Sequence, residues 1–579
     1  MWSLYNKQLL NFLVIIFLSV VTVCWSFFIF KESVNYYFLV VVIILRCMSS
    51  FAILRDYMAS WRKSTQKTFL RKIFINIPAF VIVLLLFYGR VKFSLLFSEF
   101  LFYLLLLNFS VYFYWYITSR RAIEKTEAVI IYGAGIAGTK IAQEFEGTKY
   151  RVCYFIDDAV AVQKRSIEGK KILSREQLRC KLLVDKFDML VIAIPSVKNI
   201  VIKSIYREFE KDFSQIKIMP SLDKMLQDEQ FLNQLKPVSL YDLLARDYKH
   251  LDKKSICNFI KDKVVLVTGA GGSIGSEVVR QCVKYGASKL VLLDHSEFNL
   301  YKITEECQHK NIKSVLTSVC DKDYLAKVFS EHQPHIVFHA AAYKHVPLVE
   351  GNISKAIINN IQGTKNTIDV AVEHNVESFI LISTDKAVRP TNVMGATKRV
   401  CELYLQNVGS KNTKLAAVRF GNVLGSSGSV IPKFEEQIKR GGPITVTHPD
   451  ITRYFMLIPE ACELVLQAGA IAKKAEVFVL DMGKPVKIME LAKQFRNLSG
   501  REDVEIKITG LRPGEKLYEE LLIDENDICT DYKDIFIGRK TFYDIEKLNK
   551  DIEYLMKSSN KIESLRKIVP EFEHRLNNV

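Results

Sequence analysis

The 579-residue chain lacks the cysteine spacings of a metal or redox site. Its 11 cysteines include no C-x-x-C pair and no Cys/His cluster at zinc spacing. Most lie in apolar surroundings, such as Cys24 in the first hydrophobic run, or follow a strand, as Cys320 does. This pattern predicts reduced, mostly buried thiols in a cytosolic domain, and no metal.

A nucleic-acid-binding module is also missing, although the chain is basic. The formal net charge is +17 at pH 7. Basic and aromatic residues do not, however, cluster in a recognisable module. Basic residues beside an anionic lipid surface, together with lysines scattered over a soluble surface, account for the charge. We therefore expect no nucleic-acid partner.

The front of the chain contains long apolar runs. Residues 8–30, 34–54, 73–88 and 95–117 are apolar, and most of these runs are long enough to cross a bilayer as a helix, which takes about 20 residues. The third run is the shortest. A signal peptide is disfavoured, because no small-residue cleavage site follows the first run and three more runs do. We predict a transmembrane region of four helices over residues 1–120.

Basic residues beside these runs predict their orientation. The loop after the second run and the segment after the fourth carry Arg55, Arg62, Lys63, Lys67, Arg71, Lys72, Arg120, Arg121 and Lys125. The other two loops hold only Lys31, and Arg90 with Lys92. By the positive-inside rule, both termini and the large soluble part face the cytoplasm. The sequence thus predicts a multi-pass protein of the cytoplasmic (inner) membrane, with lipid as one partner.

A first nucleotide-binding pattern follows the membrane part. A strand from Ala128 leads into G-x-G-x-x-G at Gly133, Gly135 and Gly138, and a second strand ends at Asp157. Such glycines allow a tight turn, approach of a phosphate and close helix packing. We predict a small Rossmann-like nucleotide-binding domain over residues 125–225. The sequence leaves open whether it binds a nucleotide or only packs and regulates.

A second and fuller pattern begins after a polar linker predicted at residues 226–260. A strand from Lys263 leads into G-x-x-G-x-x-G, and the next strand ends at Asp294. The helix N-terminus suits a pyrophosphate, while an acid at Asp294 suits a ribose 2′-hydroxyl and would repel a phosphate, which favours NAD over NADP. Asp321 suits an adenine contact. The residues expected to bind NAD here are Thr268, Gly269, Gly272, Ser273, Ile274, Gly275, Asp294, Asp321, Ala340, Ala341 and Ala342.

Six further stretches point to a family: TGAGGSIGSE (268–277), HAAAYKHVPLVE (339–350), STDKAVRPTNVMGATKR (383–399), VRFGNVLGSSGSVIP (418–432), ITRYFM (451–456) and GLRPGEKLYEEL (510–521). With these the chain resembles the extended short-chain dehydrogenase/reductase superfamily. Within it, the chain looks like the membrane-bound nucleotide-sugar 4,6-dehydratases that act on UDP-N-acetylglucosamine in bacterial polysaccharide and glycan synthesis. The resemblance covers essentially the whole chain, including the loop from Arg55 to Arg62.

The resemblance implies an α/β fold in which the four-helix membrane region precedes two tandem Rossmann-like domains. The second of these, residues 261–540, would be the catalytic NAD-binding dehydratase domain with an extended short-chain dehydrogenase/reductase fold. Residues 541–579 have a charged, helical pattern, and we assign them no role. We also expect a homo-oligomer.

The resemblance further implies a hydro-lyase reaction with tightly bound NAD. Sugar C4 is oxidised by hydride transfer, a base removes the C5 proton, an acid protonates the departing C6 hydroxyl, and the hydride returns to C6. By resemblance, Asp385 is the acid and Lys386 the base. Thr384 would hydrogen-bond the C4 oxygen, and Lys398 would hold the nicotinamide ribose and add positive charge to the site.

Physical chemistry sets conditions on these two roles. A lysine base needs its pKa lowered toward neutrality, which partial burial and nearby Lys398 would favour. An acid at Asp385 must stay protonated, which desolvation would favour. Adjacent Asp and Lys side chains stabilise each other's charged forms, and this works against both assignments. The sequence leaves open which effect wins.

The tyrosine that is usual in this superfamily is missing. Met394 stands four residues before Lys398, where the superfamily normally has Tyr-x-x-x-Lys, and a thioether cannot exchange a proton. We expect Met394 to pack against the sugar. Thr384, relayed through water, or Lys398 would then accept the C4 hydroxyl proton. The closest resemblance is to the methionine-bearing subgroup, whose product keeps the C5 configuration.

Substrate contacts are expected from three further places. Lys344 and His345 follow the fourth strand, where such enzymes place the sugar, although His345 fits a solvated loop histidine equally well. Asn422 resembles the family's nucleotide-contacting asparagine. Arg453 and Arg512 are candidates for the diphosphate, because a guanidinium matches phosphate oxygens in bidentate fashion.

Two other functions compete with the dehydratase. A nucleotide-sugar 4-epimerase shares the fold and oxidises C4, but it needs no acid/base pair for C5 and C6, and it normally keeps the tyrosine. A non-catalytic, membrane-anchored nucleotide-sugar sensor or scaffold fits the helices and the first Rossmann-like domain. For that role the set of Thr384, Asp385, Lys386 and Lys398 would be superfluous.

Overall fold

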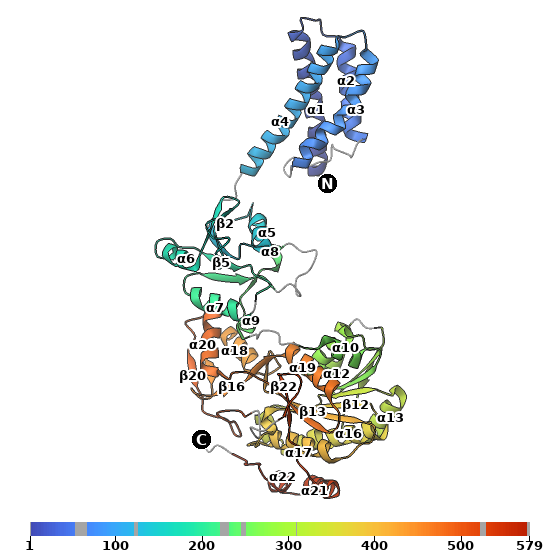
Figure 1. Ribbon diagram of the computed structural model, residues 1–579, viewed down its shortest axis with the longest axis vertical. Helices are drawn as coiled ribbons and strands as arrows, with labels where there is room; N and C mark the ends of the chain where they lie inside the picture. Colours follow the sequence, from blue (N-terminus) through green and yellow to red (C-terminus); the bar gives the residue numbers. More distant parts are fainter. Residues whose placement is uncertain are drawn as a thin grey trace. The chain divides into compact units, whose positions relative to one another are not determined.

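The computed structural model of the chain describes residues 2–52, 66–120, 126–146, 148–197, 199–220, 231–244, 251–307, 310–520 and 528–575. The chain divides into two compact units, residues 1–195 with 212–235, and residues 196–211 with 236–579 (Figure 1). The basic loop predicted from Arg55 to Lys63 and the basic positions Arg121 and Lys125 lie outside the described residues.

The first unit begins with four apolar helices: α1 (Trp2–Ile29), α2 (Tyr36–Ala52), α3 (Gln66–Phe87) and α4 (Phe93–Arg120). They form the bundle coloured blue in Figure 1. Three of them, α1, α3 and α4, are long and apolar enough to cross a membrane. The third apolar run, the shortest of the four in the sequence, lies within a helix that is longer than α2. Helix α3 has 22 residues because it starts in the basic segment before the apolar run, whereas α2 has 17.

A buried ion pair lies inside this apolar bundle. The Arg46 guanidinium on α2 donates to both carboxylate oxygens of Glu99 on α4, at 3.0 and 2.8 Å. Thr22 on α1 donates to the same carboxylate at 2.7 Å, and the Tyr103 ring lies 3.6 Å from the guanidinium. Because an unpaired charge in an apolar bundle is costly, this pair favours one mutual arrangement of α1, α2 and α4.

The rest of the first unit is a Rossmann-like sheet in the strand order β3-β4-β2-β1-β5-β6. Strand β1 pairs in parallel with β2 and β5, and β5 with β6, while β3 and β4 form an antiparallel pair. The elements are β1 (Glu127–Tyr132), α5 (Ile136–Glu144), β2 (Tyr150–Ile156), β3 (Ser166–Ile167), β4 (Lys170–Leu173), α6 (Arg175–Leu182), β5 (Met189–Ile192), β6 (Gln215–Ile218) and α8 (Phe231–Gln234). The central strands β1 and β5 are almost wholly buried, as expected of a sheet covered on both faces.

The second unit is built on a nine-stranded sheet in the order β10-β9-β8-β11-β12-β13-β18-β22-β21. The strands are β8 (Val264–Thr268), β9 (Lys289–Asp294), β10 (Ile312–Leu316), β11 (Ile336–His339), β12 (Ser378–Ile382), β13 (Lys414–Arg419), β18 (Glu476–Leu480), β21 (Ile528–Cys529) and β22 (Ile535–Gly538). Pairing is parallel from β10 to β18, and β22 is antiparallel. The strand order reverses between β8 and β11, and such a switch point opens a crevice at the carboxyl ends of the strands. This confirms the extended short-chain dehydrogenase/reductase fold.

Helices cover both faces of this sheet (Figure 1). Alternate residues of β8 enter different cores: Leu266 packs with residues of α13, α16, α17, α21 and α22, while Val265 and Val267 pack with residues of α10, α11 and α19. The helices of the whole second unit, including those of its smaller lobe, are α7 (Asn199–Phe209), α9 (Leu240–Leu244), α10 (Lys253–Ile260), α11 (Ser273–Lys284), α12 (Glu297–Glu306), α13 (Lys322–His332), α14 (Val346–Glu350), α15 (Ile353–Ala356), α16 (Gly363–Glu373), α17 (Val393–Asn407), α18 (Val430–Lys439), α19 (Ile458–Ile471), α20 (Ile488–Leu498), α21 (Ile545–Lys557) and α22 (Lys561–Ile568).

A smaller lobe completes the second unit beside the strand ends. Three two-stranded sheets pair β14 (Asn422–Leu424) with β17 (Phe455–Leu457), β15 (Ile444–Val446) with β20 (Ile506–Ile508), and β16 (Thr452–Arg453) with β19 (Val486–Lys487). Residues of α18 and α20 form its core. Part of the range predicted as a linker is ordered, because α10 buries Ile256 and Ile260 completely.

Candidate active site

The turn from β8 into α11 is shaped for a phosphate-bearing ligand. Gly269 has φ +64°, and a Cβ there would meet the Ala340 backbone at 2.8 Å. A Cβ on Gly275 would lie 2.1 Å from the Gly269 carbonyl oxygen. Helix α11 starts after Gly272, and no side chain caps it. Its first N–H groups and the positive end of its dipole are therefore available to an anion.

Asp294 lies beside this turn, where a ribose would lie. It is 5% exposed, and its carboxylate accepts hydrogen bonds from the Gly271 and Ser296 N–H groups, both at 2.9 Å. Asp321 is exposed and caps α13 by accepting from the Tyr324 N–H at 3.0 Å, so part of its acceptor capacity is used within the protein.

Thr268 faces the core rather than the crevice. Its hydroxyl lies 2.8 Å from Nδ1 of His339, whose Nε2 lies 2.9 Å from the Thr364 hydroxyl. Burial, aided by nearby Lys398, lowers the pKa of His339 to about 3, so this imidazole is neutral. Thr268 and His339 thus tie β8 to β11 at the switch point.

A cavity of about 880 Å³ opens from the glycine turn across the ends of the strands. Fifteen of the residues predicted from the sequence line it: Gly272, Ser273, Ile274, Gly275, Ala340, Ala342, Lys344, His345, Thr384, Lys386, Met394, Lys398, Asn422, Arg453 and Arg512. Among the described residues, no group of three or more His, Cys, Asp or Glu side chains gathers to hold a metal ion.

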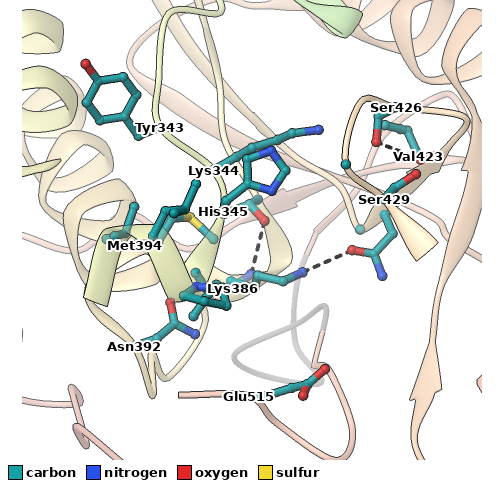
Figure 2. A pocket seen from close by; sticks show the side chains of 18 of the residues that line it. Tyr343, Lys344, His345, Lys386, Asn392, Met394, Val423, Ser426, Ser429 and Glu515 are labelled. Atoms are coloured by element: carbon teal, nitrogen blue, oxygen red, sulfur yellow. Dashed lines mark hydrogen bonds between the residues drawn. The ribbon is translucent and has the colours of Figure 1, made fainter. Parts of the chain in front are cut away.

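The segment after β12 places three proton-exchanging groups together. The Thr384 hydroxyl donates to Asp385 Oδ1 at 2.8 Å, and Lys386 Nζ donates to the same oxygen at 3.0 Å. Figure 2 shows the Lys386 side chain reaching across the pocket, where Nζ also donates to Asn422 Oδ1 at 3.2 Å. The Asp385 side chain is completely buried behind this lysine. The three groups predicted to act on the sugar therefore form one hydrogen-bonded set.

The charge state of Lys386 answers a question that the sequence left open. Burial lowers its pKa, and Arg453 acts in the same direction, but the carboxylates of Asp385 and Glu519 outweigh both. The pKa therefore lies above its usual value, so the neighbouring carboxylates prevail over burial in setting the charge of this lysine. Lys386 is an ammonium in this structure, because two carboxylates lie within 4 Å of its nitrogen.

Glu519 is the member of this site that sequence reasoning missed. Its side chain is 3% exposed and lines the cavity. One oxygen lies 3.6 Å from Lys386 Nζ and 3.6 Å from Arg453 Nε. It belongs to GLRPGEKLYEEL, where two adjacent glutamates gave no signal as to which of them turns inward.

Met394 and Lys398 stand one turn apart on α17 and face the cavity. Met394 is 4% exposed and lies near Lys386 in Figure 2. Lys398 Nζ donates to the Ile382 carbonyl at 2.8 Å. Burial lowers the pKa of Lys398, and nearby Cys401 and Glu402 only partly offset this.

A buried ionic network around Glu402 holds the end of β12 in place. Glu402 accepts from two nitrogens of Arg419, each at 2.6 Å, from Arg399 at 3.3 Å and from the Ser383 hydroxyl at 2.7 Å. Burial would raise the pKa of Glu402, but the two arginines hold it below its usual value. Ser383 is thereby held next to Thr384, so the network positions the proton-exchanging segment.

The two predicted diphosphate ligands have different surroundings. Arg453 donates to the carbonyls of Thr452, Leu517 and Lys516 and to Glu515, so its guanidinium holds the 515–517 loop. Arg512 is exposed at the cavity wall.

A cation that the sequence did not reveal lies on the same wall. Lys433 lines the cavity, and its pKa is lowered by burial and by nearby Arg512. On the wall formed by α14, burial lowers the pKa of Lys344 and, together with Lys344, that of His345.

A C-terminal segment, Glu573–Arg575, which we call the strap, joins three parts of the cavity wall. Its backbone donates to the carbonyls of Pro390 and Thr391, and the Arg575 carbonyl accepts from the Gly514 N–H at 2.9 Å. His574 Nε2 lies 2.8 Å from a Glu350 carboxylate oxygen at the end of α14. The other Glu350 oxygen accepts from the first N–H of α17 at 2.7 Å. The strap therefore positions the loops that carry the site, a role the sequence did not predict.

Comparison with known proteins gives one family. Residues 265–540 match the family described as polysaccharide biosynthesis protein. The chain is 45% identical over 424 residues to the probable polysaccharide biosynthesis protein EpsC of Bacillus subtilis, covering 71% of each chain. It is 44% identical over 463 residues to the capsular polysaccharide biosynthesis protein CapD of Staphylococcus aureus, covering 77% of each. It is also 33% identical over 305 residues to a UDP-glucose 4-epimerase of Rickettsia rickettsii, covering 51% of this chain and 85% of that one.

Proposed function

We propose, from the premise that this chain belongs to the polysaccharide biosynthesis protein family, that it is an NAD-dependent UDP-N-acetylglucosamine 4,6-dehydratase. The product would be the UDP-4-keto-6-deoxy sugar with the C5 configuration retained, for use in bacterial glycan or polysaccharide synthesis. One observation carries the proposal: Asp385 and Lys386 lie together at the cavity, while Met394 takes the position of the usual tyrosine.

The glycine turn and Asp294 fit a dinucleotide. The Gly269–Gly275 turn leaves no room for side chains, and the start of α11 presents uncapped N–H groups. Asp294 would bind the adenosine ribose, and Lys398 would hold the nicotinamide ribose. When bound, NAD would take a hydride from sugar C4 and later return it to C6.

The chain's own residues would perform the proton transfers. Thr384 would hydrogen-bond the C4 oxygen and relay its proton. Lys386 would take the C5 proton once its ammonium has released a proton to solvent, and Asp385 would give its proton to the C6 oxygen, so that water leaves. Met394 would pack against the sugar and exclude water there. The exposed Arg512 and the nearby Lys433 would neutralise the diphosphate.

A nucleotide-sugar 4-epimerase is the alternative, and the epimerase relative favours it. The two reactions share oxidation at C4. They differ in that only elimination of water needs an acid and a base beyond C4. The grouping of Asp385, Lys386 and Glu519 around one side of the cavity supports elimination, because an epimerase has no use for them there.

The test is to incubate the full-length chain, in detergent, with UDP-N-acetylglucosamine and no added cofactor. We expect loss of one water by mass spectrometry and a 4-keto-6-methyl signature by NMR, both abolished in Asp385→Asn and Lys386→Ala. A mass-neutral galacto isomer would establish the epimerase instead. Tight binding of the sugar nucleotide without turnover would favour the sensor.

We further propose that helices α1–α4 place the enzyme in the cytoplasmic membrane with the second unit in the cytoplasm. The support is the length and apolar character of α1, α3 and α4, together with the basic residues of the sequence around them. A homo-oligomer remains our expectation.

A further inference from the structure

The carboxylates around Lys386 outnumber the cations that they contact. Lys386 contacts Asp385 at 3.0 Å and Glu519 at 3.6 Å. Arg453 contacts the same Glu519 at 3.6 Å and Glu515 at 3.4 Å. Three carboxylates thus share two cations.

Burial makes this imbalance costly. The side chains of Asp385 and Glu519 are 0% and 3% exposed, whereas Glu515 is 21% exposed and reaches water. Among the described residues, one oxygen of each buried carboxylate, Asp385 Oδ2 and Glu519 Oε2, has no hydrogen-bond partner. A buried, uncompensated carboxylate is strongly disfavoured, and a proton on one of the two removes the excess charge.

We infer that this cluster stores one extra proton and that Glu519 makes the storage possible, as the standing counter-ion of Lys386. Because Glu519 and Arg453 satisfy the charges on that side, the Lys386 ammonium does not require an ionised Asp385. Asp385 can then hold the proton that leaves with the C6 oxygen. The inference rests on the proposed dehydratase, and it explains how Asp385 can stay protonated next to a lysine.

The proton balance closes with residues already present. When the C6–O bond breaks, the proton on Asp385 leaves in the water molecule and Asp385 becomes a carboxylate. The proton released from the C4 hydroxyl replaces it. The C5 proton goes to the Lys386 amine, which has first released its ammonium proton to solvent, and returns to C5 as C6 receives its hydride. Glu519 acts through Lys386 and is a positioning residue, since it exchanges no atom with the sugar.

The groups that face Lys386 come from four elements, and Glu519 is the titratable one to which the proposed mechanism gives no contact with the sugar. Asp385 lies in its own turn, Asn422 on β14, Arg453 on β16 and Glu519 in the loop after β20. Replacing Glu519 by glutamine keeps its shape and removes one negative charge. A cluster with one negative charge fewer releases its protons at lower pH.

The experiment measures the pH profile of water loss for the full-length chain. Elimination requires one acid and one base, so the profile is bell-shaped. Glu519→Gln should move both limbs to lower pH by at least about one unit, and Glu519→Asp should restore much of the wild-type position. The adjacent Glu520, whose side chain is 43% exposed and pairs with Arg389, provides the matched control. Glu520→Gln should leave the profile in place.

Three outcomes would overturn the inference. A Glu519→Gln profile that is lower but unmoved would mean that Glu519 only supports the fold. A loss of nucleotide-sugar binding in that variant, measured by calorimetry, would mean the same. If the wild-type chain interconverts C4 isomers without losing water, the proposed dehydratase fails first, and the stored proton has no use. That result is distinguishable, because it appears in the wild-type product before any variant is made.

Discussion

The two Rossmann-like sheets share the same glycine turn and differ in the residues at the ends of their other strands. In the first unit, Asp157 accepts from the Ala134 and Ala159 N–H groups at 2.9 Å each. In the second, Asp294 accepts from two N–H groups at the same distance. A Cβ on Gly138 would lie 2.0 Å from the Gly133 carbonyl oxygen, which is the counterpart of the Gly275 clash. The glycine and acid pattern therefore determines a backbone turn in both units.

The two units differ in the residues that follow their other parallel strands. In the second unit, β12 is followed by Ser383-Thr384-Asp385-Lys386; Ser383, Thr384 and Lys386 line the cavity, and Asp385 lies buried behind Lys386. The corresponding strand of the first unit, β6, is followed by Met219 and Pro220, which exchange no protons. Whether the first unit binds a nucleotide stays a prediction. The comparison teaches that a dinucleotide-type turn indicates a fold, and that chemistry has to be read from the neighbouring strands.

The largest difference between the two units should appear when a methyl group is placed in the glycine turn of the second unit and, as a control, in that of the first. Gly275→Ala would drive a Cβ to 2.1 Å from a carbonyl oxygen, so the second turn must open. We expect loss of bound nicotinamide cofactor and a fall in turnover of about 100-fold or more, since one misplaced group can cost that much. Cofactor released on denaturation and the initial rate of water loss are the measurements.

Gly138→Ala is the matched change in the first unit. It should destabilise that unit and leave cofactor content and turnover within about twofold of wild type, because mutations at distant, independent sites add. An equal loss of turnover in Gly138→Ala would break the comparison by making the first turn part of the active site.

The second prediction compares the stability lost when a buried ion pair is broken with that lost when an exposed one is broken. Replacing Glu402 by glutamine removes the carboxylate that pairs with buried Arg419, while Arg399 keeps Glu571 at 2.9 Å, and this loss should cost about 3–5 kcal/mol. Replacing Asp158, which pairs with Arg175 in the first unit and is 51% exposed, should cost less than about 1 kcal/mol. Hydrogen exchange of the β12 and β1 peptides would localise each loss to its own unit.

The pH dependence of the Glu402 contribution follows from its lowered pKa. A carboxyl whose pKa is lower in the folded state stabilises fully above its unfolded value of about 4.3. That stability disappears as the pH falls through the folded-state pKa. Protection of β12 should therefore fall more steeply below about pH 4 in wild type than in Glu402→Gln. Equal slopes would mean that other carboxyls control acid unfolding.

The smallest effect should come from the two aspartates. Asp294→Asn keeps the shape but loses the charge that strengthens a hydrogen bond to a ribose hydroxyl. Hydrogen bonds to charged groups contribute about 1.5–3 kcal/mol, so the affinity for NAD should fall about tenfold or more. Asp157→Asn should leave it unchanged. A comparable loss in Asp157→Asn would show that the first turn contributes to the NAD measured.

Local patterns predicted most of the fold and the NAD side of the site. The four apolar runs became α1–α4, and the strands before Gly133 and Gly269 became β1 and β8. Such features depend on residues close in sequence, where glycine spacing and apolar runs act directly on the backbone. For the same reason Thr384, Asp385 and Lys386 could be placed at a strand end from the sequence.

The charge balance around Lys386 and the contacts of the C-terminal strap could not be predicted in this way. Glu519 reaches Lys386 from a distant loop and, together with Asp385, raises the pKa of the lysine, a direction that the sequence left open. His574 reaches Glu350 across 224 residues. Both depend on which of many carboxylates turns inward, and that is decided by tertiary packing. Arg453 shows the same limit, because the sequence made it a candidate for the diphosphate and its donors are taken by the 515–517 loop and the Thr452 carbonyl.

The strap also has a consequence for how the protein is made. Residues 573–575 come after every other described residue of the cavity wall, and domains fold from the N-terminal side as the chain leaves the ribosome. The Rossmann sheet of the second unit can assemble before then, and its glycine turn with it. The loops around Pro390 and Gly514 obtain their shared partner only when the strap emerges. A nascent chain should therefore hold a dinucleotide well before it can process a sugar.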